Sequence, residues 1–395
     1  MADIVASVGW SEHTDALLAG TEAAEQALRR LLPLKPKLAV VFGSSWFNQA
    51  TLLQGVRALL GSLPLVGEST AGEIGPSGPS TRSCVILLIG GEALAHGIGC
   101  GEGVDRMPRQ AGQQAAYAAL RDFHSPRAGM LLFGDGLVTR YTEVLRGIQE
   151  ALGTSALIIG GLAGDDFRYT RTYQYHQQRV LTGAVVSVLF GGGAKVGVGV
   201  EHGFAPISKP RRVTRAQANI LYELDEQPAA SVYEEYLGPE LVQQMRQEGL
   251  LRRGIAYPLG MQSESSSEWL LRNVLAFGPD GSLSCTGDVI EGSWLQLMIG
   301  NRELALGAAR KAAEQAVRSL DRVGCVIVFD SAIRRRLLGS EYAAREIAQV
   351  RDIVGQSTPL AGCYTYGELT PYGASPNGER TAIQTGSVLV IALGT

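Results

Sequence analysis

Three short, glycine-containing loops carry acidic and hydroxyl side chains that could do chemistry. Thr70 stands three residues before Glu73 in the first loop, and Thr365 stands three residues before Glu368 in the third. Glycine lets backbone N–H groups come close to a ligand, and a carboxylate can accept hydrogen bonds from an ammonium group or a backbone amide. The loops are therefore candidate ligand sites, with predicted residues Thr70, Gly72, Glu73, Gly164, Asp165, Tyr364, Tyr366, Gly367 and Glu368.

Three interpretations of these loops stay open. Because the motif recurs, whereas a ligand site need occur only once, capping of the loops' own amides is the simplest explanation of the carboxylates. As general acids or bases, Glu73, Asp165 or Glu368 would make the protein an enzyme acting on a small metabolite. Tyr364 and Tyr366, together with Glu368, would suit a small amine or amino acid without any cofactor.

The loops belong to a unit that occurs three times. Residues 64–78 read PLVGESTAGEIGPSG and residues 359–373 read PLAGCYTYGELTPYG, without a gap between the matched positions. Residues 155–167 (SALIIGGLAGDDF) are a weaker copy. Continuous Val/Ile/Leu runs before and after each copy predict strands that are covered on both faces. With helices expected at 111–123 and 304–320, the sequence predicts an α/β fold of repeated β-α-β units and mixed sheets.

A polar residue follows the first apolar run of each unit. Ser44 follows VVFG, Asp135 follows LLFG and Asp330 follows VIVF. In open α/β sheets, ligands collect beyond the carboxyl ends of the strands. Asp135 therefore joins the predicted ligand-binding residues.

Composition excludes several classes of protein. The chain has 395 residues, a formal net charge of −3 and no long block of Lys or Arg, so a nucleic-acid partner is not expected. Its apolar runs are too short to span a bilayer as helices. Five scattered cysteines without a CxxC pair, and no signal peptide, predict a cytoplasmic protein. No GxxxxGK[ST] or GxSxG motif indicates an enzyme.

Residues 203–300 do not show the sequence pattern of the three repeats. Pro228 near a helix start and Gly238 at its end predict a helix over 227–238. Strands are expected at 219–224, 255–261 and 269–277. We place a boundary here, which gives an N-terminal domain of residues 1–235 and a C-terminal domain of residues 236–395.

Several ordered motifs resemble the FIST family of bacterial sensory proteins. They are VGESTAGEI at 66–74, the segment from HGFAPISKP to VYEEYLG at 202–238, and AGCYTYGELTPYG at 361–373. The resemblance implies tandem FIST N and FIST C domains in a non-enzymatic small-ligand sensor. It also implies a partner signalling enzyme, a histidine kinase or a cyclic-di-GMP enzyme, because the chain carries no output module of its own; a homo-oligomer would be a second route.

One branch of this family, the stand-alone nitric-oxide-sensing haem proteins, has little beyond the two FIST domains. The resemblance to that branch implies haem as the cofactor and nitric oxide as the signal. A haem iron needs an axial donor such as histidine. His202 is the sharpest candidate for this metal ligand, since Phe204 and Pro206 follow it and could flank a macrocycle. A hydrogen-bonded structural histidine is the competing interpretation.

Overall fold

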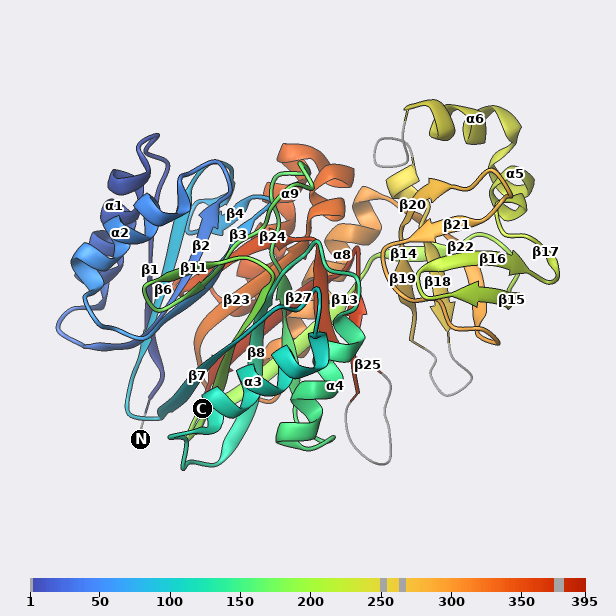
Figure 1. Ribbon diagram of the computed structural model, residues 1–395. Coiled ribbons are helices and arrows are strands. Elements are labelled where there is room, and N and C mark those ends of the chain that lie inside the picture. Colours follow the sequence, from blue (N-terminus) through green and yellow to red (C-terminus); the bar gives the residue numbers. More distant parts are fainter. Residues whose placement is uncertain (1–2, 249–253, 263–267, 373–379) are drawn as a thin grey trace.

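Three six-stranded sheets of closely similar design form the body of the protein (Figure 1). The structure is a computed structural model and describes residues 3–248, 254–262, 268–372 and 380–395. In spatial order the first sheet is β1 (Val5–Ser11), β6 (Cys84–Gly90), β2 (Pro36–Ser44), β3 (Leu65–Thr70), β10 (Gln174–His176) and β11 (Arg179–Leu181). The second is β7 (Leu94–Glu102), β12 (Ala184–Gly192), β8 (Arg127–Gly134), β9 (Ile158–Leu162), β25 (Gly367–Tyr372) and β26 (Arg380–Gln384). The third is β13 (Lys195–Glu201), β27 (Val388–Gly394), β23 (Val323–Ser331), β24 (Leu360–Thr365), β4 (Glu73–Gly75) and β5 (Gly78–Ser80).

Each sheet contains one β-α-β unit, whose two strands are parallel neighbours. Helices α2 (Gln49–Leu60), α4 (Tyr141–Leu152) and α9 (Ala332–Val354) connect β2 to β3, β8 to β9 and β23 to β24. The runs in these strands are buried on both faces, as their continuous apolar sequence predicts. The predicted α/β fold of repeated β-α-β units with mixed sheets is thus confirmed.

A second helix covers each sheet at very short range. These helices are α1 (Ala16–Leu31), α3 (Pro108–Leu120) and α8 (Arg302–Val317), and their buried faces are mostly alanine. The facing strands carry glycine: a Cβ on Gly99 would come within 1.9 Å of the Ala115 carbonyl oxygen, and one on Gly199 within 1.8 Å of that of Ala312. Glycine is needed there because the helix backbone occupies the space of a side chain.

The three sheets meet around a central trio of phenylalanines. Phe42 of β2, Phe133 of β8 and Phe329 of β23 are fully buried, with ring centroids 6.0–6.3 Å apart in tilted or edge-to-face pairs. The same position of each repeat therefore fills the same place in one shared core, which relates the repeats by an approximate threefold axis.

Each repeat also lends a hairpin to the sheet of another. β4–β5 follows β3 in sequence but pairs with β24, and β10–β11 pairs with β3 rather than with β9. The hairpin of β25 and β26 pairs with β9. The exchange is cyclic, so the first and last thirds of the chain share their sheets. The predicted boundary between residues 235 and 236 stays a prediction.

A fourth sheet forms a smaller lobe beside this body (Figure 1). Its path is β19 (Leu270–Arg272), β18 (Leu259–Gln262), β22 (Trp294–Gly300), β15 (Arg211–Gln217), β16 (Ile220–Leu224), β21 (Leu283–Cys285) and β20 (Val274–Phe277), with β14 (Phe204–Pro206) on β22 and β17 (Gln227–Pro228) on β16. The lobe also holds α5 (Ser231–Leu237), α6 (Pro239–Glu248) and the short 3-10 turn at Gly254–Ala256. The prediction of one helix over 227–238 was wrong at its start, because Gln227–Pro228 pairs as a strand with Glu223–Leu224. Among the described residues, no helix is both long and apolar enough to cross a membrane.

Candidate functional site

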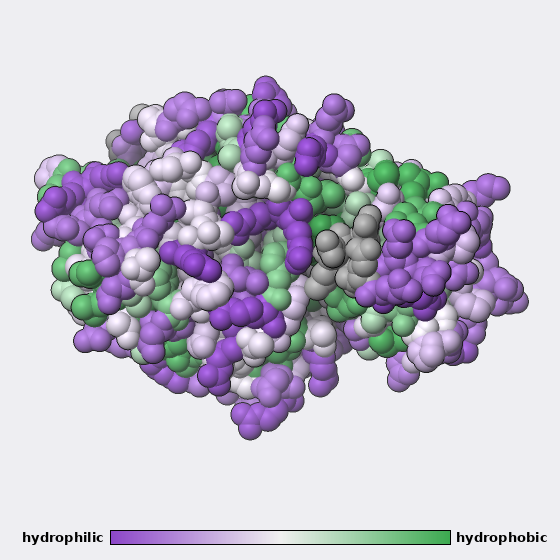
Figure 2. Space-filling model, turned by 90° about the horizontal axis from the view of Figure 1, so that it is seen from above, coloured by the Kyte–Doolittle hydropathy of each residue, from purple (hydrophilic) through white to green (hydrophobic). Residues whose placement is uncertain are grey.

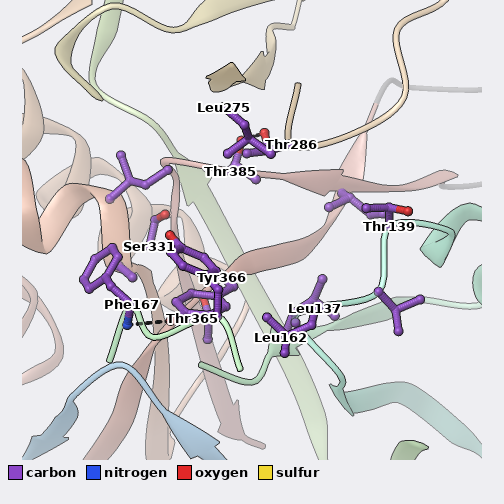
Figure 3. Close-up of a pocket in the computed structure, with 16 residues that line it drawn as sticks. Leu137, Thr139, Leu162, Phe167, Leu275, Thr286, Ser331, Thr365, Tyr366 and Thr385 are labelled. Carbon is purple, nitrogen blue, oxygen red and sulfur yellow. Dashed lines mark hydrogen bonds between the residues drawn. The ribbon is translucent and has the colours of Figure 1, made fainter. Parts of the chain in front are cut away.

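A cavity of about 330 Å³ opens where the second and third sheets meet the smaller lobe (Figure 3). It lies at the carboxyl ends of β9, β23 and β24, as the general rule for α/β sheets predicts. Figure 2 looks down on this end of the molecule and shows apolar side chains gathered where the body and the lobe meet. The lining residues are Gly136, Leu137, Val138, Thr139, Leu162, Phe167, Tyr169, Leu275, Thr286, Ser331, Ala332, Ile333, Thr365, Tyr366, Ile383 and Thr385.

The wall of this cavity is apolar and aromatic, with hydroxyl groups and no charge among its described residues. Tyr169 and Tyr366 stack at 4.9 Å with an interplanar angle of 24°, and Phe167 packs 6.1 Å from Tyr366. Five of the lining residues are Ser or Thr, namely Thr139, Thr286, Ser331, Thr365 and Thr385. Such a wall suits a small, uncharged, flat molecule held by a few hydrogen bonds.

Asp165 does not line the cavity, but its hydrogen bonds hold the aromatic residues Tyr169 and Tyr366 in the cavity wall. It is only 1% exposed, and its carboxylate accepts hydrogen bonds from the backbone amides of Tyr169, Thr170 and Arg171 and from the Tyr366 hydroxyl. Burial opposes ionisation, but these hydrogen bonds outweigh it and lower the pKa of the carboxyl. Asp165 therefore acts as the cap of residues 166–171, which was the simplest prediction.

Glu73 and Glu368 occupy equivalent buried positions in the first and third repeats. Each accepts from the threonine three residues earlier (Thr365 to Glu368 at 2.7 Å) and from the backbone amide and hydroxyl of a serine that precedes the next strand, Ser83 or Ser387. Burial, partly offset by these hydrogen bonds, raises the pKa of Glu73 to about 7 and that of Glu368 to about 8. Both side chains are fully buried and neither lines the cavity.

Asp135 does in the second repeat what these glutamates do in the others. It accepts from the backbone amide of Gly183, which corresponds to Ser83 and Ser387, and from the Thr172 hydroxyl at 2.8 Å. Asp135 is 7% exposed and directly precedes the lining residue Gly136. In the second repeat the equivalent acidic side chain therefore directly follows β8, whereas in the first and third repeats it comes from the glycine-containing loop.

The other predicted loop residues position the backbone. Gly72 has φ +127°, and a Cβ there would collide with the Arg335 guanidinium; one on Gly164 would contact Ala71 at 2.6 Å. Thr70 and Tyr364 are fully buried, and Gly367 pairs with Leu162. Of all the predicted ligand-binding residues, Tyr366 alone is among the described residues that line the cavity. The expected group of Tyr364, Tyr366 and Glu368 around an amine does not form, because two of the three point into the core.

His202 lies at a second, more polar hollow of about 630 Å³ beside β13. Its Nδ1 accepts a hydrogen bond from the Phe204 backbone amide at 3.0 Å. Burial, together with the nearby Arg334, lowers the pKa of the imidazole to about 4, so the ring is neutral at pH 7. Phe204 is buried against Leu271 and Met298, and Pro206 pairs with Met298 in β14.

This geometry does not fit an axial haem ligand. A histidine that binds a metal usually donates its second ring N–H to a carbonyl or a carboxylate. In His202 the second nitrogen accepts instead, which leaves the proton on Nε2, the nitrogen that would have to bind iron. Phe204 and Pro206 are engaged in the lobe and do not flank a free face of the ring. The contacts of His202, Phe204 and Pro206 agree with the competing interpretation of a hydrogen-bonded structural histidine.

The first turn of α9 connects the cavity to a buried ionic cluster. Ser331, Ala332 and Ile333 line the cavity, and Arg334 is completely buried between Asp330, at 3.0 Å, and Glu346. Arg334 also donates to the backbone carbonyls of Ala305 and His202, so it joins α9 to α8 and to the entrance of the lobe. The buried guanidinium of Arg334, held by two carboxylates and two backbone carbonyls, fixes the position of this turn.

Sequence reasoning missed most of the lining residues. Leu137, Val138 and Thr139 directly follow the strand end that Asp135 marks, so their position was a usable signal. Ile383 and Thr385 come from or directly follow β26, a strand that reaches the cavity only through hairpin exchange. Leu275 and Thr286 come from the lobe, where no motif indicated a ligand site.

Comparison with known proteins agrees with the motifs. Residues 37–227 match the FIST N domain and residues 229–371 match the FIST C domain. An uncharacterized protein of Mycobacterium tuberculosis is 26% identical over 387 residues, 92% of this chain and 94% of that protein. An uncharacterized protein of Methanocaldococcus jannaschii is 26% identical over 279 residues, 66% of this chain; the match spans about half (53%) of that relative's length.

Solved structures resemble the chain only distantly. A cyanuric acid hydrolase from A. caulinodans aligns over 98% of this chain and 99% of its own, with 12% identity and a TM-score of 0.35. T. maritima PurL complexed with AMPPCP aligns over 99% of this chain and 73% of its own, with 11% identity and a TM-score of 0.21. Likeness at this level carries no argument about chemistry.

Proposed function

Because the chain belongs to the FIST family of sensory proteins, with a FIST N and a FIST C domain, we propose that it senses a small ligand in the cavity and regulates a partner signalling protein. The main support for this proposal is that both family domains supply residues to the cavity wall. The FIST N domain supplies lining residues between Leu137 and Tyr169, and the FIST C domain supplies lining residues between Leu275 and Tyr366. A ligand bound there contacts both domains at once, so its binding can change the position of one domain relative to the other.

The signal can travel through two elements of the wall. One is the segment of residues 166–171 that Asp165 caps, and the other is the first turn of α9, which carries Ile333. Gly339, with φ 71° and ψ 172°, interrupts α9 a little further on and separates this turn from the rest of the helix. A ligand shifts an equilibrium by its difference in affinity for two states, so we expect it to select one arrangement of this turn.

The wall favours an uncharged ligand over the amine or amino acid that we also considered. An ammonium group needs a carboxylate or several acceptors, and Glu73, Asp165 and Glu368 are all buried outside the cavity and bonded within the protein. The same observation weakens the alternative of an enzyme that uses these three carboxyls as acid or base, because they do not reach a substrate in the cavity. A histidine kinase or a cyclic-di-GMP enzyme is the partner class that we propose.

Haem with nitric oxide was the more specific expectation, and a spectrum tests it. We expect that haemin added to the purified protein gives the same Soret band for the natural protein and for His202→Ala, since Nδ1 of His202 accepts the Phe204 amide. Nuclear magnetic resonance should show the His202 imidazole neutral, with the proton on Nε2, throughout pH 6–8. A Soret band that moves with nitric oxide and is lost in His202→Ala would restore haem as the cofactor.

Filling the cavity tests the proposed function itself. In a thermal-shift screen of small uncharged aromatic compounds, a compound at about a hundred times its Kd should stabilise the natural protein by about 2.7 kcal/mol. Leu275→Trp replaces a lining leucine with a bulkier indole side chain and should abolish that stabilisation. Leu18→Trp is the matched control, because Leu18 is 44% and Leu275 42% exposed but Leu18 lies on α1, away from the cavity. Equal stabilisation of both variants would exclude the cavity as the site.

A further inference from the structure

Five residues form a surface beside the cavity, which we call the arginine patch: the exposed Trp46, Arg82, Arg168 and Arg336 and the half-buried Arg335. They come from the loop after β2, the loop after β5, the loop after β9 and the first turns of α9. The Trp46 ring is 53% exposed, with the guanidinium carbons of Arg82 and Arg168 at 4.2 and 4.7 Å from its centroid. The patch is thus assembled from all three repeats around the approximate threefold axis.

Arg168 donates to the Asp165 carbonyl and the Ser45 hydroxyl, and the two arginines of α9 are also held in place by neighbouring groups. Arg335 donates to the backbone carbonyls of Ala71 and Ser80 and lies 4.8 Å from the centroid of the Tyr364 ring. Arg336 lies 4.8 Å from the centroid of Phe167, one of the lining residues of the cavity. Stacked guanidinium groups are ordered before any partner arrives, which reduces the entropy lost on binding.

The positive charge of the patch is not neutralised by ion pairs. None of its four arginines forms a salt bridge among the described residues, whereas exposed arginines such as Arg29 and Arg345 do. Two acids lie beside the patch: Asp165, whose backbone carbonyl accepts from Arg168, and Asp166, whose side chain accepts from Ser45 and lies near Arg168 and Arg335. Four arginines against Asp165 and Asp166 leave a local excess of two positive charges, on a protein whose net charge is −3.

We propose that the arginine patch is the surface that binds the partner, through an acidic protein segment. Unpaired arginines attract carboxylates and can bind them in bidentate geometry. Arginine, tryptophan and tyrosine are also the residues that contribute most to protein–protein binding energy, and the Trp46 ring is 53% exposed. A nucleic acid fits less well, because the patch is small and the rest of the protein is acidic.

The position of the patch connects it with the proposed sensing of a ligand. Arg336 follows the lining residue Ile333 by one helical turn, and Arg168 lies between the lining residues Phe167 and Tyr169. A ligand that moves these segments would therefore alter the spacing of the arginines. This link rests on the proposed function, but binding of an acidic segment is measurable without any ligand in the cavity, so the two proposals can fail separately.

The test uses the full-length protein and a fluorescein-labelled oligoglutamate peptide, followed by fluorescence anisotropy. We expect binding that weakens as salt rises, and a loss of at least about tenfold in affinity for R82Q/R168Q/R336Q. Arg335 stays, because its backbone contacts hold β4–β5. The control R121Q/R212Q/R318Q removes the same charge from exposed arginines that have no salt bridge among the described residues, and it should bind like the natural protein.

Three results would overturn the proposal. The first is no binding of the peptide even at low salt. The second is equal loss in the two triple variants, which would mean that only net charge matters. The third is preference for single-stranded DNA of equal charge by about tenfold or more, lost in R82Q/R168Q/R336Q, which would assign the patch to a nucleic acid. Leu275→Trp should leave peptide binding unchanged, so a failed ligand screen does not affect this test.

Discussion

Asp165→Asn is expected to lower the free energy of unfolding by about 3 kcal/mol at pH 7, since hydrogen bonds to a charged group contribute about 1.5–3 kcal/mol each. The Asp165 carboxylate accepts three backbone amides and the Tyr366 hydroxyl. Asparagine offers one oxygen, and its NH₂ group would face backbone N–H groups that are also donors. The loop that holds Phe167 and Tyr169 should then lose its order, and ligand binding with it. Urea unfolding measures the first effect, and a thermal-shift screen the second.

Asp166→Asn is the matched control for this prediction. Asp166 is adjacent and only half-buried, and its side chain accepts a hydrogen bond from the Ser45 hydroxyl at 3.1 Å. We expect a cost below about 1 kcal/mol, the scale of one neutral hydrogen bond. The pKa of Asp165 is lowered in the folded protein, so the stability that it supplies is present above the pKa of the unfolded chain and is lost as pH falls below about 4. A difference between the two variants that stays constant down to acid pH would contradict the ionised cap.

The repeated strands could be predicted from sequence because each is fixed by its own residues. Runs such as Leu38–Phe42 and Cys325–Phe329 are apolar at every position, and a run that is this short and rich in valine fits a strand covered on both faces. The parallel pairing of β2 with β3 and of β23 with β24 follows from the helix between them.

The exchange of hairpins could not be predicted in the same way. Nothing in the residues 73–80 specifies that they pair with β24, almost three hundred residues later, because backbone hydrogen bonds are the same with any partner. The cavity depends on this exchange, since Ile383 reaches it on a strand next to β25, which pairs with β9. Sequence reasoning therefore found the loops that build the site and missed most of the residues that line it.

His202 shows a different limit. Its type and its neighbours Phe204 and Pro206 agree with a metal ligand, but the role of an imidazole depends on what each ring nitrogen contacts. The amide that donates to Nδ1 belongs to Phe204, two residues on, and the local turn at Gly203, with φ +71°, brings it there. The residue types alone do not reveal such a turn.

Glu368 is expected to make the folded protein less stable as pH rises from about 5 to 8. Burial raises the pKa of Glu368 to about 8 in the folded state, against 4.5 ordinarily. The stability that comes from a raised pKa is fully present below the unfolded value and is lost as pH rises toward the folded value. At about 1.4 kcal/mol for each pH unit, the loss over this range is about 4 kcal/mol when the site stays neutral throughout.

Glu368→Gln should remove this part of the pH dependence. The Thr365 hydroxyl donates to Glu368 at 2.7 Å and lies 3.3 Å from the Asp330 carbonyl; in the variant, the glutamine NH₂ group can donate to this hydroxyl, which then donates to the Asp330 carbonyl alone. The glutamine oxygen still accepts from the Ser387 amide. Urea unfolding should therefore give similar stabilities for both proteins at pH 5, and a variant more stable than the natural protein at pH 8. The control is Glu201→Gln, at a partly exposed position of β13, whose stability should equal that of the natural protein at both pH values. If the stability of Glu368→Gln changes with pH in the same way as that of the natural protein, Glu368 is ionised in the folded state.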